Sequence, residues 1–142
     1  MTEDERWDYL VQLDDELLLG GVILSEWCSF ITKEADTAFA KGANLAALLT
    51  AVAAIETHLR AESGQRAKAR LVDLIDGADI EADLRPDLHR LRLYRNRWVH
   101  IDDPWDDADI LASPETHEQE LASMAEFAMR AMRRVLYSSP WV

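Results

Sequence analysis

The sequence predicts an all-α protein, an antiparallel helical bundle of about five to six helices that occupies residues 1–142 as one domain. Apolar residues recur at helical spacing along most of the chain, and no segment alternates long enough to predict a strand. Capping residues and glycines mark the ends of these segments. With 49% hydrophobic and 30% charged residues, the composition is typical of a folded chain with one core.

The first helix is expected from a capping signal at the N-terminus. Thr2 followed by Glu5 has the spacing of a capping box. Apolar residues at roughly helical spacing continue from there to the glycine pair at 20–21. We therefore expect residues 1–19 to form an additional N-terminal helix, and residues 21–136 to form the core bundle.

A second helix is expected from the glycine pair to about Lys41, and Gly42 suits its C-terminal cap. Apolar residues cover one broad face of this segment. Trp27 and Phe30 belong to that face, so we expect both side chains to lie in the core.

The middle of the chain predicts a long helix and a short one. Asn44 is expected to cap a third helix over residues 45–62, whose many alanines allow close packing. Ser63-Gly64 ends it, so this is expected to be the central helix. A shorter amphipathic helix is expected over residues 66–76.

Two further helices are predicted in the C-terminal half. Pro86 fits the first turn of a helix that ends near His100, and the aspartate-rich segment 102–107 predicts a loop. Ser113 and Pro114 fit the N-cap and first position of a final helix. Its inward-facing residues are expected to be Leu121, Met124, Phe127, Ala128, Ala131 and Val135.

The charge of the chain is unevenly distributed. A net charge of -12 argues against a protein that binds nucleic acid over its whole surface, because counterion release needs clustered Lys and Arg. Residues 85–97 nevertheless hold five arginines and one aspartate, whereas residues 102–109 hold five aspartates and no basic residue. A local basic patch is therefore expected on an otherwise acidic protein.

The only cysteine is Cys28, which excludes an intramolecular disulfide and favours a reducing compartment. The acidic N-terminus lacks the pattern of a secretory signal, and no apolar run approaches the roughly 18 residues of a membrane helix. We therefore expect a cytoplasmic protein with no membrane partner.

Several common catalytic motifs are absent, among them GxGxxG, Walker A, HExxH, GxSxG and the EF-hand loop. Glu56 and His58 are only two residues apart, so they point to different faces of a helix and cannot form the Glu-x-x-His pair of a dimetal site. We expect no metal site and no cofactor.

The remaining constellation is Arg95-Asn96 followed, after three residues, by His100. It resembles the R-x4-6-H motif of HEPN domains, helical bundles that are often dimeric, metal-independent ribonucleases, in which Asn commonly follows the Arg. The chain has only two asparagines, which makes this match more specific. Residues 54–59, Ala-Ile-Glu-Thr-His-Leu, are similar to a family segment that carries an inward acidic residue, here Glu56.

This resemblance covers about residues 21–136 and implies a metal-independent endoribonuclease, a hydrolase of toxin–antitoxin or antiviral defence systems. It implies an RNA substrate, a homodimer with the site at its interface, and an antitoxin or inhibitor protein as a further partner. The toxin branch paired with small nucleotidyltransferase antitoxins has His-x-Tyr, whereas this chain has His100-Ile101-Asp102, so the partner stays open.

Ribonuclease chemistry explains these residue types. RNA carries its own nucleophile, the 2′-OH, so cleavage to a 2′,3′-cyclic phosphate needs a base for that proton and an acid for the leaving oxygen. His100 can serve near neutral pH, and because a helix C-terminus favours positive charge we expect the acid role. Arg95 would clamp the phosphate, and Asn96 would orient the imidazole or contact the phosphate.

Two geometric requirements accompany this hypothesis. In a regular helix Arg95 lies about 140° around the axis from His100, so the last turn must unwind or the arginine must reach across. One motif histidine per chain cannot be acid and base at once, so two motifs are expected to meet across a two-fold interface.

The nearby arginines leave two interpretations open. Arg92 and Arg97 are expected to bind the RNA backbone, with Arg90 as a further candidate. They could equally pair with the aspartates of residues 102–107, and we expect such a pair for at least one of them.

Simpler roles are expected for the other polar and aromatic candidates. Arg95 and Asn96 could also be ordinary polar residues at an exposed helix end. Glu56 could be an exposed carboxylate or one that is paired within the core. Trp98 and Trp105 are expected to pack rather than to stack on bases. Three arginines near the C-terminus are expected to complement the dipole of the final helix: Arg130, Arg133 and Arg134. The other histidines are expected to lie on the surface: His58, His89 and His117.

A different class of function is also compatible with the sequence. The net charge and the aspartate-rich segment beside the motif oppose the approach of RNA. The alternative is a non-catalytic HEPN-like module for dimerisation, partner binding or nucleotide binding.

Overall fold

Within the residues that the computed structural model describes, 1–64 and 69–140, the chain forms seven helices and no β-strand. The all-α prediction is confirmed, and the helix that was not expected, α6, lies between the predicted loop over residues 102–107 and the final helix. The helices are α1 (Glu3–Leu17), α2 (Glu26–Ala40), α3 (Asn44–Ser63), α4 (Leu71–Gly77), α5 (Leu84–Val99), α6 (Ala108–Ala112) and α7 (Pro114–Leu136). The first part of the helix expected over residues 66–76 lies outside the described residues.

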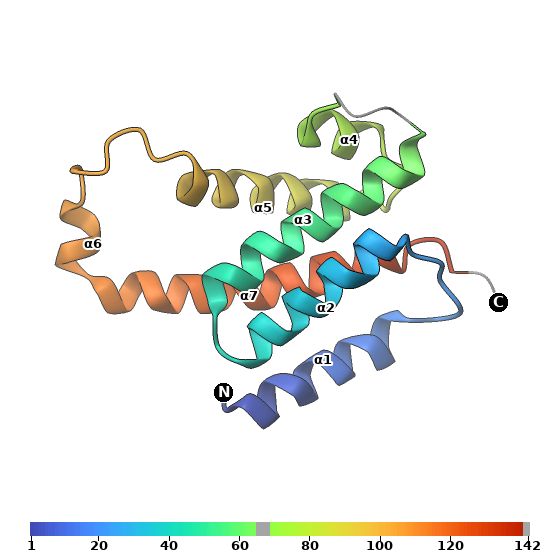
Figure 1. Ribbon diagram of the computed structural model, residues 1–142, viewed down its shortest axis with the longest axis horizontal. Coiled ribbons are helices and arrows are strands. Elements are labelled where there is room, and N and C mark those ends of the chain that lie inside the picture. Colours follow the sequence, from blue (N-terminus) through green and yellow to red (C-terminus); the bar gives the residue numbers. More distant parts are fainter. Residues whose placement is uncertain (65–68, 141–142) are drawn as a thin grey trace.

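The long helices run in alternating directions, with α3 near the middle of the bundle (Figure 1). α3 contacts α2, α4, α5 and α7, most extensively α2 and α7. Its small residues permit this approach, because side chains such as Ala47, Ala51 and Ala54 are completely buried between neighbouring helices. The expectation that this helix is central is therefore confirmed.

The capping box at the start of α1 is present. The Thr2 hydroxyl accepts a hydrogen bond from the Glu5 amide at 3.1 Å, and the Glu5 carboxylate accepts one from the Thr2 amide at 2.7 Å. This exchange pairs amide groups that a helix N-terminus leaves without internal partners.

The start of α2 differs from the expectation, whereas its end agrees with it. The helix begins at Glu26 rather than at residue 21, because the Ser25 hydroxyl caps it by accepting from the Cys28 amide. Gly42 follows the helix at φ +80°, and the amides of Gly42 and Ala43 donate back to the last turn. This is the Schellman geometry that favours glycine.

The placement of Trp27 and Phe30 in the core was wrong. These side chains are 78% and 63% exposed, on the outward face of α2. The core face of this helix is instead made by Cys28, Ala35 and Phe39, all fully buried. Small residues on that face let α2 lie close to α3, so the larger apolar side chains remain outside.

Asn44 does not cap α3 as expected. It is the first helical residue, and its side chain accepts a hydrogen bond of 2.9 Å from Arg6. The same guanidinium donates to the Phe39 carbonyl at 2.8 Å and lies 4.7 Å from the centroid of the Phe39 ring. Arg6 thereby fastens α1 to the turn between α2 and α3.

The arginines near the end of α7 fasten other helices rather than only complementing the helix dipole. Arg133 is 2% exposed and donates to Asp14 of α1 at 2.8 Å and to Asp36 of α2 through two bonds of 2.8 and 2.9 Å. Arg130 pairs with Glu16 of α1, and Arg134 pairs with carboxylates that precede and begin α5. These arginines are therefore occupied by structural ion pairs.

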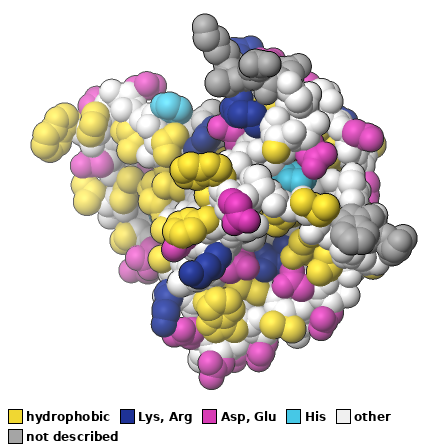
Figure 2. Space-filling model, turned by 45° about the vertical axis from the view of Figure 1, so that its right-hand side comes forward, with side chains coloured by type: hydrophobic (Ala, Val, Ile, Leu, Met, Phe, Trp, Pro, Cys, Tyr) yellow, Lys and Arg dark blue, Asp and Glu magenta, His cyan; other side chains and the backbone are white. Residues whose placement is uncertain are grey.

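Acidic side chains are spread over the face shown in Figure 2, where they outnumber the basic ones, in agreement with the net charge of -12. Among the described residues, no helix combines the length and the apolar character that a membrane span requires.

Candidate active site at the end of α5

The motif lies at the C-terminal end of α5. The helix ends at Val99, and His100 is its C-cap with non-helical dihedral angles of φ -126° and ψ 72°. The His100 amide still donates to the Asn96 carbonyl at 3.0 Å, so this end of the backbone remains tied to the last turn. Because regular helix stops just before His100, the 140° separation expected from helix geometry does not fix where its side chain points.

Arg95 and Asn96 interact directly. Arg95 Nε donates to Asn96 Oδ1 at 3.0 Å, and both side chains are partly buried. No carboxylate pairs with Arg95 within the part of the chain that the structure describes. The terminal nitrogens of its guanidinium therefore meet no negative charge among residues 1–64 and 69–140.

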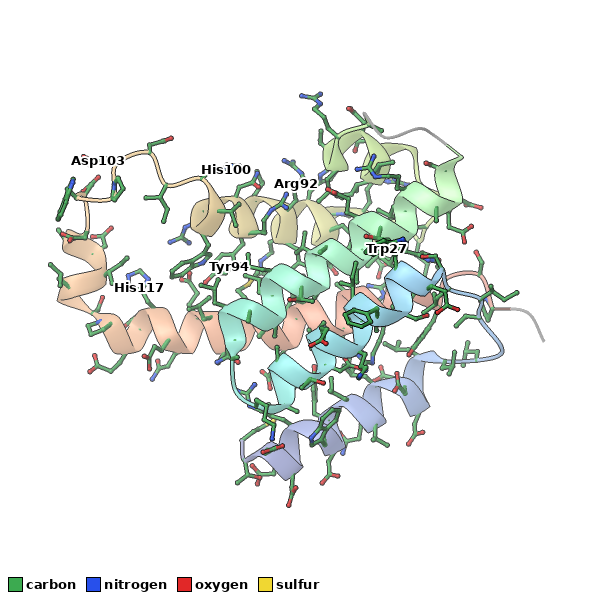
Figure 3. The ribbon with its side chains drawn as sticks, viewed as in Figure 1. Trp27, Arg92, Tyr94, His100, Asp103 and His117 are labelled. Atoms are coloured by element: carbon green, nitrogen blue, oxygen red, sulfur yellow. The ribbon has the colours of Figure 1, made fainter. Side chains whose placement is uncertain are left out.

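His100 is exposed at the tip of α5. Figure 3 places its side chain and that of Arg92 on the side of α5 that faces away from α7, whereas Tyr94 points towards α7. Among the described residues, the imidazole makes no hydrogen bond or ion pair. This side chain is free to meet a ligand or a second chain.

Glu56 is not joined to the motif by any hydrogen bond or ion pair among the described residues. Its carboxylate lies 3.5 Å from Arg60, one turn further along α3, and is 36% exposed. The supporting role that the resemblance implies for Glu56 therefore stays a prediction.

The other arginines of residues 85–97 have partners. Arg85 donates to backbone carbonyls at the end of α4, including those of Ile75 and Asp76, and so takes the place of a cap there. Arg92 lies 3.4 Å from His89, one turn earlier on α5. The basic segment therefore combines one structural clamp with side chains that face solvent.

Arg90 and Arg97 lie on aromatic rings at the α7 side of α5. The Arg90 guanidinium is 4.8 Å from the ring centroid of Phe127, and that of Arg97 is 5.3 Å from the centroid of Tyr94. Arg97 also pairs with Glu120 of α7 at 3.2 Å. Such cation–π contacts orient the charged heads while leaving them close to water.

The expected ion pair between these arginines and the aspartates of residues 102–107 is not formed. Arg97 uses Glu120 instead, and no ion pair of the described residues involves an aspartate of that segment. The reason is geometric: the segment leaves the end of α5 and extends beyond the bundle (Figure 1). Its negative charge therefore stays exposed beside the motif.

Of the two tryptophans near the motif, Trp98 packs partly against the core as expected. Trp105 does not pack, since it is 87% exposed in the segment between α5 and α6.

The three remaining histidines do not share one environment. His58 was expected on the surface but is 7% exposed, and burial lowers its pKa, an effect that Glu62 at 3.7 Å partly opposes. His89 is partly buried and lies 2.8 Å from an Asp76 oxygen, while His117 is partly buried on α7. The motif histidine is thus the only exposed one of the four.

Sequence reasoning missed a groove between α5 and α7. It has a volume of about 800 Å³, and its lining includes Arg90, Leu93, Tyr94 and Arg97 from α5 and Glu120 and Met124 from α7. The α5 residues were visible as a basic stretch, but nothing in the sequence indicated which part of α7 lies opposite. We call this feature the α5–α7 groove.

Within residues 1–64 and 69–140, no three His, Cys, Asp or Glu side chains converge in a way that could hold a metal ion. Comparisons with protein-family models, with curated proteins and with solved structures find no match. The likeness to HEPN domains therefore rests on the motif residues themselves.

Proposed function

We propose that the protein is a metal-independent endoribonuclease of HEPN type, with Arg95 and His100 as catalytic residues. The observation that carries the proposal is the state of Arg95. Its Nε is held by the neutral amide of Asn96, while the described residues place no carboxylate on its guanidinium. Arg97 and Arg133, in contrast, are engaged by acids of this chain.

The proposed reaction needs only groups of the protein and of the RNA. A base takes the 2′-OH proton, and O2′ attacks the adjacent phosphorus as the P–O5′ bond breaks. An acid gives a proton to the leaving O5′, so that a 2′,3′-cyclic phosphate and a 5′-OH are formed. Arg95 would stabilise the charge that develops on the phosphate oxygens.

The two proton transfers call for two histidines. Because each chain brings one motif histidine, the site is proposed to form where two copies meet at the ends of their α5 helices. The exposed position of His100 at the tip of α5 supports this arrangement. Arg92, beside it on the same side of the helix, is proposed to contact the RNA backbone (Figure 3).

The test uses purified protein and RNA in the presence of EDTA. The wild type is expected to cut, and Arg95→Ala and His100→Ala are each expected to abolish cutting while the helical circular dichroism is kept. Arg70→Ala, at an exposed arginine that precedes α4 and pairs with Asp73, serves as the control away from the motif and should cut as the wild type does. Undiminished cutting by both motif variants would refute the proposal.

The biological setting proposed here is a toxin or an antiviral defence component, and it follows from the resemblance alone. An antitoxin or inhibitor protein is the partner that this setting implies. Growth arrest on induction of the wild type, but not of His100→Ala, is the expected result in cells.

A second candidate function is a non-catalytic dimerising, partner-binding or nucleotide-binding module. It is favoured by five aspartates that follow His100 at residues 102–109 and make no ion pair among the described residues. Exposed negative charge at this place opposes the approach of RNA. Measurable nucleotide affinity together with a lack of RNA cleavage would favour this candidate.

A further inference from the structure

The segment that follows the motif is exposed along almost its whole length. Within residues 101–112, which we call the acidic arm, no residue is buried, and α6 contacts only α7 among the described helices. Its apolar residues stand out: besides Trp105, Leu111 is 73% exposed, and Ile101 and Ile110 are about half exposed. In Figure 2 hydrophobic and acidic side chains lie side by side on the left, the side on which Figure 1 shows α6.

The α5–α7 groove has the complementary chemistry. Leu93 and Met124 give it apolar walls, and two guanidinium groups, those of Arg90 and Arg97, stand at its rim. Glu120 is the only carboxylate in its lining and pairs with Arg97, so the groove keeps one net positive charge, that of Arg90. The groove is open to solvent along its length, so a side chain from another chain can enter it from outside.

We propose that the acidic arm of one copy docks in the α5–α7 groove of a second copy, with Trp105 in the groove and the aspartates beside Arg90 and Arg97. The exchange is reciprocal, so it closes as a two-fold dimer and leaves no free arm. Tryptophan and arginine are the residues that most often dominate the energy of such interfaces.

The geometry of this exchange rests on the proposed function, which brings the ends of two α5 helices together. When two helices meet there in antiparallel fashion, the chain that leaves one of them runs along the other towards its N-terminus. Trp105 lies five residues after His100 and can reach up to about 17 Å from it in an extended chain. Arg90 lies only about 10 Å before Arg97 along the helix axis, so the groove is within reach.

The arm does not occupy the groove of its own chain. Figure 3 shows Asp103 beyond the end of α5, whereas Tyr94, in the groove lining, points towards α7 in the middle of the helix. RNA is the competing occupant of a basic groove. The apolar walls, Leu93 and Met124, favour a peptide that carries a tryptophan over a bare polyanion.

The experiment measures the mass of the full chain in solution by sedimentation equilibrium over a range of concentrations. The wild type is expected to be a dimer, and Trp105→Ser is expected to weaken dimerisation at least about 30-fold, the effect of losing one dominant interface residue. Trp27→Ser is the matched control, because Trp27 is also a largely exposed tryptophan but lies on α2. It should leave the dimer unchanged.

Charge exchange gives a second and independent test. A groove variant, Arg90→Glu with Arg97→Glu, and an arm variant, Asp106→Lys with Asp107→Lys, should each dimerise poorly alone. An equimolar mixture should form a heterodimer, since each arm then meets a groove of opposite charge.

Retention of wild-type dimerisation by Trp105→Ser and by both charge variants would overturn the arm exchange. If those dimers still cleave RNA, the proposed function survives that result. A monomeric wild type would also overturn the arm exchange. The proposed function is then tested separately, by RNA cleavage in EDTA. An unchanged dimer whose groove variant loses RNA binding would assign the groove to RNA instead.

Discussion

Asn96 links the two residues on which the proposed chemistry depends. Its side-chain oxygen accepts a hydrogen bond of 3.0 Å from Arg95 Nε, and its backbone carbonyl accepts one of 3.0 Å from the His100 amide. A neutral amide can hold the arginine without neutralising it, so the guanidinium keeps its full attraction for a phosphate. Any residue at position 96 would make the backbone bond, so the side-chain bond to Arg95 is the contact that supports the proposed role of Asn96.

Replacing this amide by a carboxylate should harm catalysis more than removing it. Asn96→Asp puts a negative charge against Arg95 Nε, and the resulting charge-assisted hydrogen bond competes with the phosphate. We expect kcat/KM for RNA cleavage to fall about 10- to 100-fold below the wild type, and further than in Asn96→Ala. Steady-state cleavage of a fluorogenic RNA measures it, and an Asn96→Asp enzyme as fast as the wild type would argue against this role.

The buried arginine of α7 should be essential for stability. Arg133→Met leaves Asp36, whose side chain is 21% exposed, without its arginine, while Asp14 keeps the hydrogen bond from the Tyr137 hydroxyl; breaking a buried ion pair costs about 3–5 kcal/mol. Arg130→Met is the matched control on the same helix, because Arg130 and Glu16 are both largely exposed and such pairs are worth less than about 1 kcal/mol. Urea unfolding of the two variants compares them directly, and equal losses would show that burial does not matter here.

The helices could be predicted from the sequence because their signals are local. Thr2 and Glu5 are three residues apart, and Gly42 directly follows the helix that it ends. The face of α2 could not be chosen in this way. Trp27 and Phe30 carry an apolar signal as strong as that of Phe39, and only the small residues that admit α3 decide which face is buried.

In the candidate site, too, local features could be predicted from the sequence and contacts between helices could not. Arg95, Asn96 and His100 lie within six residues, so their spacing was readable from the chain. Partners from other helices could not be predicted in this way. Glu120, for example, pairs with Arg97 although the two are 23 residues apart in the sequence. The expectation that an aspartate just after the motif would be that partner failed because proximity in sequence is not proximity in the bundle.

The buried histidine predicts how stability depends on pH. The folded protein holds His58 with a lowered pKa because burial disfavours its charged form, so the unfolded chain binds its proton more readily. Stability from this group is therefore fully present above the unfolded pKa of about 6.5 and is lost as the pH falls below it, by at most about 1.4 kcal/mol per pH unit.

The comparison with His58→Gln isolates that contribution. As the pH is lowered from 7 to 5, the free energy of unfolding of the wild type should fall relative to that of this variant. Other titrating groups cancel in the difference. A difference that stays constant over this range would show that His58 is not held neutral by the fold.

The most direct test of the central claim is the identity of the products formed from a defined RNA in EDTA. Mass spectrometry should find a 2′,3′-cyclic phosphate on one fragment and a 5′-OH on the other, and a single 2′-deoxy substitution at the cleaved position should block the cut, because the nucleophile is then missing. Fragments that end in a 3′-OH and a 5′-phosphate, or cutting that persists at the 2′-deoxy position, would contradict the proposed mechanism.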